Sequence, residues 1–185
     1  PSSSCSIDSS IDLDGPAILY VNLAHQYLII CAVIKSAYIM VKYGQMKEIL
    51  TALMIWLGAN TTLDTNHDIP KVVFLPQDKM EQLYYVDEPE KIPNELHGLY
   101  DTDSDTIILR DTWDRRKAWD MGVLIHEMVH YLQDLNDVEF QCTAQMEKDA
   151  WPIQQKYLKE QHDYNWQYDS LWYMVISTCS DAFNY

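Results

Sequence analysis

The chain has 185 residues, of which 48% are hydrophobic and 22% are charged, a composition typical of one globular domain rather than a disordered chain. Its 28 Asp and Glu residues outnumber its 13 Lys and Arg residues, which gives a formal net charge of −15. Because this charge repels phosphate backbones and anionic lipid head groups, we expect neither a nucleic acid nor a membrane surface as partner.

The N-terminal region differs in composition from the rest of the chain. Residues 1–15 are rich in Ser and Asp and predict a flexible arm, followed by a single domain over 16–185. The chain begins without Met and shows no intact signal peptide, so we expect a processed form. Residues 17–34 are apolar, but three polar residues interrupt them, which favours a buried segment over a membrane span.

The first part of the expected domain has a mostly helical pattern. Residues 17–57 are rich in Leu, Ile, Met, Ala and Tyr, and Gly44 is their main interruption. This pattern predicts helices at about 17–42 and 46–57. The β-branched run at 27–34 could instead form a strand.

A small sheet is expected in the middle of the chain. The apolar run at 71–75 lies between two prolines and reads as a strand, and residues 77–84 could form a short helix. Two further apolar runs, at 98–100 and 106–110, flank a polar Asp/Ser turn and predict a hairpin.

Helical periodicity returns after the hairpin. Residues 113–135 carry apolar side chains at helical spacing, and a second helix is expected at about 139–161, where Pro152 should kink it or start a new turn. A final apolar helix is expected at 170–178. The expected fold class is therefore α+β, with a small central sheet and helices on both sides of it in sequence.

One pentapeptide, HEMVH, carries the clearest chemical signal, because His126, Glu127 and His130 form an H-E-x-x-H pattern. Residues four apart lie on the same face of a helix, so both imidazoles can reach one metal ion at about 2.0–2.1 Å. Glu127 is rotated by about 100° around the helix axis and can act as a general base on a water molecule beside the ion. The alternative is a pair of solvated histidines on a helix face.

A zinc site of this type needs a third protein ligand. The metzincin pattern fails, because Gln133 and Asn136 stand where it requires Gly and His. Gluzincins use a Glu on the following helix, and Glu147 lies 17 residues after His130. Glu147 opens an E-x-x-A match, in which the small Ala150 lets two helices approach closely. The competing candidates are Asp149, Glu139 and Asp134.

Residues 98–158 resemble the small single-domain bacterial gluzincins, also called minigluzincins. The segments that carry this resemblance are GLYDTDSDTIILRD, VLIHEMVHYLQ and CTAQMEKDAWPIQQKYL, and it extends more weakly back to about residue 47. The resemblance implies a zincin-like fold, with the active-site helix followed by a ligand-bearing helix. It also implies a zinc-dependent peptidase, in which the two histidines and Glu147 hold one Zn²⁺ and Glu127 is the general base.

The resemblance has implications for the substrate as well. An extended peptide would bind by β-augmentation along an edge strand, expected at about Thr106–Arg110. A Tyr or His would stabilise the oxyanion, and we prefer Tyr157 or His162. The other candidates are Tyr131, Tyr164, Tyr168 and Tyr173. In one departure from the family, Trp151 stands where thermolysin-type enzymes carry an Asp that partners a ligating His.

The cysteines and the Ser-rich start bear on the compartment. Four cysteines without a CxxC pair predict an exported protein, secreted or periplasmic, with at least one disulfide, although four buried free thiols are the alternative. Cys142 and Cys179 are the preferred pair, because both are expected on C-terminal helices.

Two other functions compete with that of a peptidase, which we expect to be a monomer. One is a zincin-fold peptide-binding or latent domain that binds zinc without efficient proteolysis. The other is a metal-free helical interaction protein. The acidic excess has no catalytic use in any of these, and it could solvate the surface or steer basic peptides.

Overall fold

The structure is a computed structural model that describes residues 44–84 and 96–179. The chain divides into two compact units, Pro1–Glu48 and Ile49–Tyr185. The expected arm, the expected helix at 17–42 and its alternative strand lie outside the described residues.

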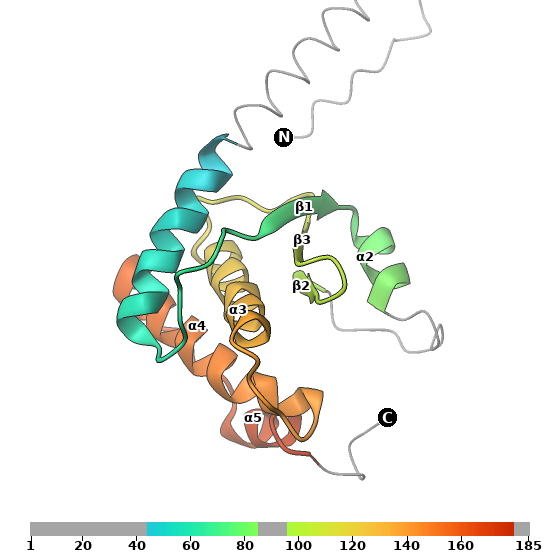
Figure 1. Cartoon of the computed structure of the whole chain (residues 1–185), viewed down its shortest axis with the longest axis vertical. Coiled ribbons are helices and arrows are strands. Elements are labelled where there is room, and N and C mark those ends of the chain that lie inside the picture. Colours follow the sequence, from blue (N-terminus) through green and yellow to red (C-terminus); the bar gives the residue numbers. More distant parts are fainter. Residues whose placement is uncertain (1–43, 85–95, 180–185) are drawn as a thin grey trace, which may run out of the picture. The chain divides into compact units, whose positions relative to one another are not determined.

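The described residues combine helices with a small sheet, which confirms the α+β class (Figure 1). A helix at residues 44–60 comes first. The elements that follow are β1 (Lys71–Leu75), α2 (Gln77–Tyr84), β2 (Gly98–Asp101), β3 (Thr106–Arg110), α3 (Ala118–Leu135), the 3-10 helix η1 (Thr143–Met146), α4 (Glu147–His162) and α5 (Ser170–Ile176).

The sheet has three strands in the order β1-β3-β2, with β1 parallel and β2 antiparallel to β3. Strand Thr106–Arg110 therefore has a neighbour on both sides, and the expectation that a peptide binds along it as an edge strand is wrong. The hairpin pattern in the sequence predicts the pairing of β2 with β3 but not the pairing of β1 with β3. The parallel pairing of β1 joins residues more than 30 positions apart, such as Val72 and Ile107, and no local signal reveals it.

Helix α3 is the centre of the core (Figure 1). Every residue from Asp120 to Gln133 is buried, because α3 lies between the sheet and α4 and is apolar around most of its circumference. Helices α3 and α4 pack closely where Gly122 faces α4, since an added Cβ would lie 2.9 Å from Leu158 Cδ2. Ala150 is fully buried on α4, as the E-x-x-A pattern predicts for a close approach of two helices.

Helix α3 begins at Ala118, five residues later than the periodicity predicts. The buried Asp120 in its first turn explains the difference. Its carboxylate pairs with Arg110 at 3.2 Å and accepts a hydrogen bond from the backbone N–H of Asp114 at 2.8 Å, and its carbonyl accepts from the Trp113 indole at 2.6 Å. These contacts hold the residues before α3 in a turn.

Helix α4 continues through Pro152, which was expected to kink it or start a new turn. Proline has no N–H, so the carbonyl of Lys148, four residues earlier, lacks its helical donor. The hydroxyl of Tyr173 on α5 donates to that carbonyl at 2.9 Å and supplies the missing hydrogen bond. Tyr173, one of the candidates for oxyanion stabilisation, is therefore engaged with the backbone of α4.

A disulfide joins Cys142 and Cys179, as predicted, with the Cα atoms 5.8 Å apart. Each cysteine lies just outside a helix rather than within one, since Cys142 precedes η1 and Cys179 follows α5. The disulfide joins the end of the α5 region to the segment before η1, and the Tyr173 hydrogen bond joins α5 to the first turn of α4.

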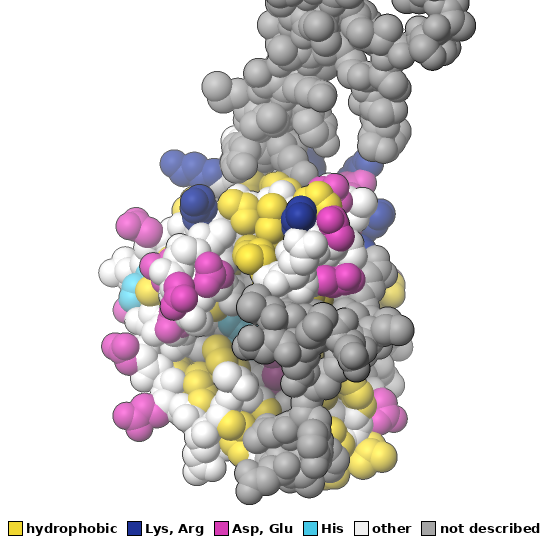
Figure 2. Space-filling view, turned by 90° about the vertical axis from the view of Figure 1, so that its right-hand side faces the viewer, with side chains coloured by type: hydrophobic (Ala, Val, Ile, Leu, Met, Phe, Trp, Pro, Cys, Tyr) yellow, Lys and Arg dark blue, Asp and Glu magenta, His cyan; other side chains and the backbone are white. Residues whose placement is uncertain are grey.

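The acidic side chains on the face seen in Figure 2 are spread out rather than gathered in one patch. In the space-filling view, Asp and Glu side chains lie at several separate places on the visible face (Figure 2). Among the described helices, none is both long and apolar enough to cross a membrane.

Candidate metal centre

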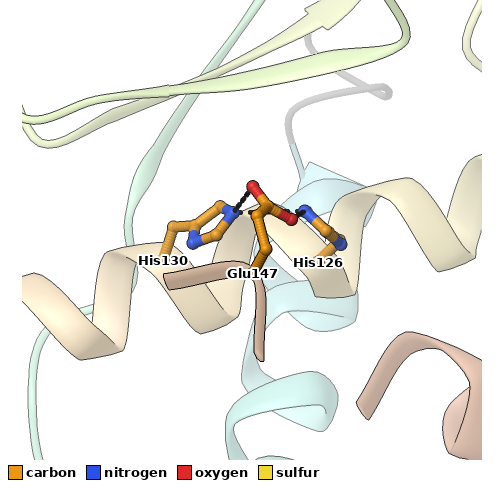
Figure 3. A group of neighbouring side chains, drawn as sticks. All are labelled: His126, His130 and Glu147. Carbon is orange, nitrogen blue, oxygen red and sulfur yellow. Dashed lines mark hydrogen bonds and ion pairs between the residues drawn. The ribbon is translucent and has the colours of Figure 1, made fainter. Parts of the chain in front are cut away.

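Three side chains from two helices converge at the core of the domain (Figure 3). The Nε2 atoms of His126 and His130 lie 3.1 Å apart. Glu147 Oε2 lies 3.2 Å from His126 Nε2, and Glu147 Oε1 lies 3.4 Å from His130 Nε2. The candidate ligand atoms all lie within 4.8 Å of one another, so this group could hold a metal ion.

The helices explain why the three side chains meet. His126 and His130 are one turn apart on α3, and their rings meet edge to face with centroids 4.8 Å apart. Glu147 is the first residue of α4, so its carboxylate projects from the start of that helix toward α3. The structure thus brings together the metal ligands that the sequence and the resemblance predict.

The competing ligand candidates are engaged or placed elsewhere. Asp149 accepts a hydrogen bond from Gln133 Nε2 at 3.3 Å, and Asp134 accepts one from the Tyr100 hydroxyl at 2.7 Å. Glu139 is exposed after the end of α3. Within residues 44–84 and 96–179, Glu147 is the acid that joins the two histidines.

The pKa values of His130 and Glu147 are shifted in opposite directions. Burial lowers the pKa of His130, but its hydrogen bond with Glu147 and the charge of Glu127 outweigh burial and raise that pKa to about 9. Burial acts to raise the pKa of Glu147, but hydrogen bonds with His126 and His130 outweigh it and hold the pKa far below its usual range. Without a metal ion, the group therefore contains an anionic carboxylate and a protonated imidazole at neutral pH.

This pairing predicts a pH window for the stability of the metal-free protein. The raised pKa of His130 stabilises the fold fully below its ordinary value of 6.5, and this stabilisation is lost as pH rises toward about 9. The lowered pKa of Glu147 stabilises the fold above its ordinary value of 4.5, and this stabilisation is lost in acid. Thermal melts should show the largest Tm difference between wild type and Glu147→Ala at pH 4.5–6.5. A difference that grows above pH 9 would contradict this account.

Glu127 is buried beside the group, under strand β2. Burial raises its pKa, the charges of His126 and His130 act against this, and Glu147 adds to it. Gly98, the first residue of β2, is in close contact with Glu127, since an added Cβ would lie 2.8 Å from Glu127 Oε1 and 2.6 Å from Val123 Cγ1. The sequence analysis did not single out Gly98, although a glycine at the start of a strand can indicate a close backbone approach.

The side chains around the two histidines differ. His130 Nδ1 lies 3.0 Å from Gln133 Oε1. His126 Nδ1 is buried and has no hydrogen-bond partner among the described residues, and the ring of His126 instead packs against that of Trp151 with centroids 4.7 Å apart. Trp151, the departure from the family pattern, thus meets His126 through a contact between rings.

Tyr157 and His162, the preferred oxyanion-stabilising residues, do not lie in this group. They come ten and fifteen residues after Glu147, which places them about 15 and 22 Å farther along α4. The ring of Tyr157 contacts those of Trp56 at 5.2 Å and His162 at 5.5 Å. Their placement gives no support to an oxyanion role.

The fold and the site define an α+β domain in which two adjacent helices present a His–His–Glu group. The chain belongs to the family described as Domain of unknown function (DUF6647), whose model matches residues 42–181. This range includes α3 and α4, and hence all three residues of the group. The comparisons with curated proteins and with solved structures gave no match.

Proposed function

We propose that this protein is a zinc-dependent peptidase, with His126, His130 and Glu147 as the zinc ligands. The separation of the ligand atoms carries the proposal. A tetrahedral zinc ion with bonds of about 2.0–2.1 Å holds its ligand atoms about 3.3–3.4 Å apart. The three separations across this group are 3.1, 3.2 and 3.4 Å. Glu147 Oε2 is buried and lies 3.2 Å from His126 Nε2, so its negative charge faces the same point as the imidazole nitrogens.

The chemistry of the proposed reaction depends on Glu127. A bound zinc ion would polarise the scissile carbonyl and lower the pKa of a neighbouring water molecule. Glu127 would take the proton from that water and pass it to the leaving amine. The raised pKa of Glu127 supports this role, because a general base works best with a pKa closer to the operating pH.

Strand β2 is the best candidate for the substrate-binding edge. Within the described sheet, β2 pairs only with β3, so its other side can accept an extended peptide by β-augmentation. Gly98 places the backbone of β2 against Glu127. A peptide on this edge would therefore lie beside the proposed general base.

Gly98→Ala tests the fit between β2 and Glu127. The added methyl group requires a shift of Glu127 or of β2, so we expect cleavage to fall by about 10- to 100-fold while zinc affinity is retained. Steady-state kinetics and zinc titration measure the two effects. Gly44→Ala is the matched control, since an added Cβ there meets nothing within 4 Å and should leave both values unchanged. Full activity of Gly98→Ala would contradict this placement of the substrate.

Metal content and cleavage together test the proposed function. We expect one zinc ion per chain after gentle purification, and cleavage within a broad peptide library that a chelator abolishes and added zinc restores. Zinc without any cleavage would favour the peptide-binding or latent domain. Absence of zinc binding would eliminate both and favour the metal-free interaction protein.

The disulfide supports the proposal that the enzyme is exported, because disulfides persist in oxidising compartments. Mass spectrometry under non-reducing conditions should detect the peptide pair that contains Cys142 and Cys179. Free thiols at both positions in protein isolated from its native compartment would argue against export.

A further inference from the structure

Resting on the metal-binding part of the proposed function, we propose that Gln133 is a positioning residue that fixes the ring of His130 and the start of α4 together. Gln133 is fully buried at the contact between α3 and α4. Its Oε1 lies 3.0 Å from His130 Nδ1. Its Nε2 donates to the carbonyl of Met146 at 3.0 Å and to Asp149 Oδ2 at 3.3 Å.

The neighbours of Gln133 determine which way its amide points. A backbone carbonyl and a carboxylate accept hydrogen bonds and cannot donate them. The side of the amide that faces Met146 and Asp149 must therefore be the nitrogen, and the oxygen must face His130. An amide oxygen only accepts, so His130 Nδ1 must carry a hydrogen.

This hydrogen bond determines what the other nitrogen of His130 can do. In a neutral imidazole with the hydrogen on Nδ1, Nε2 holds a lone pair. His130 Nε2 is the atom that faces Glu147 and His126, while Nδ1 points away from them (Figure 3). Gln133 thus selects the tautomer that can bind a metal ion and holds the ring in that orientation.

The same amide reaches the third ligand through the backbone. Met146 and Asp149, which accept its hydrogen bonds, lie on either side of Glu147 in sequence. The buried side chain of Gln133 therefore connects His130 on α3 to the first turn of α4, which begins with Glu147. Because Asp149 accepts from the amide, its charge can polarise the hydrogen bond to His130.

Zinc affinity, measured by competition with a chelator, tests this role in the full chain. We expect Gln133→Met to weaken zinc binding by about 10- to 100-fold, the usual effect of losing a residue that orients a ligating histidine. Gln154→Met is the matched control, because Gln154 is also a buried glutamine and lies two turns along α4 from Glu147. Its zinc affinity should stay within about threefold of wild type. Equal losses in the two variants, or no loss in Gln133→Met, would overturn the proposal.

A spectroscopic measurement on the metal-free wild type needs neither a variant nor a bound ion. At a pH at which ¹⁵N NMR of the imidazole shows His130 to be neutral, the same spectrum should show the hydrogen on Nδ1. A hydrogen on Nε2 instead would overturn the proposal even if Gln133→Met fails to fold. These tests of Gln133 can fail or succeed independently of the peptidase proposal. A wild type that binds zinc without cleaving peptides would remove the proposed function and leave the role of Gln133 to be decided by affinity and NMR.

Discussion

Replacing Glu127 by Gln is expected to reduce the rate of peptide cleavage by about 10²- to 10⁴-fold, the range that a general base contributes. The variant should keep its bound zinc. Gln keeps the shape of the side chain and cannot accept the proton. Glu127 is close to His126 and His130 but is not part of the ligand group, so zinc stoichiometry should stay at the wild-type value.

The same substitution should leave the fold intact or make it more stable. Burial raises the pKa of Glu127, so its charged form opposes folding above its ordinary pKa of 4.5. A neutral amide removes this opposition at neutral pH, and the Tm should be equal to or higher than that of wild type. A loss of activity with no loss of Tm is the signature of a residue kept for chemistry rather than for stability.

Kinetics, metal analysis and thermal melts on Glu127→Gln measure these three effects. Glu139→Gln is a suitable control, since Glu139 is exposed and outside the site, and it should cleave peptides like wild type. If Glu127→Gln cleaves the same peptides at the wild-type rate, the proposed general base is wrong.

Glu147→Ala is expected to have the second large effect, which is a loss of zinc affinity. The loss should exceed the roughly 10- to 100-fold loss expected for Gln133→Met, because a residue that orients a ligand contributes less than the ligand itself. The substitution removes one of the three proposed protein ligands. In the metal-free protein it also leaves the two Nε2 atoms, 3.1 Å apart, without the carboxylate that pairs with both.

Asp149→Asn separates Glu147 from its competitor. Asparagine keeps an oxygen that can accept the hydrogen bond from Gln133, so this variant should retain most of the zinc affinity. Isothermal titration with zinc, or competition with a chelator, compares the two variants. Wild-type affinity in Glu147→Ala together with a large loss in Asp149→Asn would reverse the assignment of the third ligand.

Local patterns in the sequence determined much of the fold and the candidate site. The helix that holds His126 and His130, the strands at 71–75 and 106–110 and the α+β class follow from periodicity and turn residues, which depend on neighbours within a few positions. The two histidines share a helix face for the same reason. Glu147 followed from its spacing and from the resemblance, and the structure places it against both histidines.

Long-range packing decided the rest. The parallel pairing of β1 made Thr106–Arg110 the central strand, and the direction and length of α4 carried Tyr157 and His162 away from the ligand group. The positions of Gln133 and Gly98 depend on contacts between α3, α4 and β2. A hydrogen bond or a close approach between separate elements leaves no periodic trace in the sequence, because it depends on how those elements pack. The sequence by itself therefore determined the candidate ligands, and only the tertiary structure decided which residues contact them and which strand edge lies beside them.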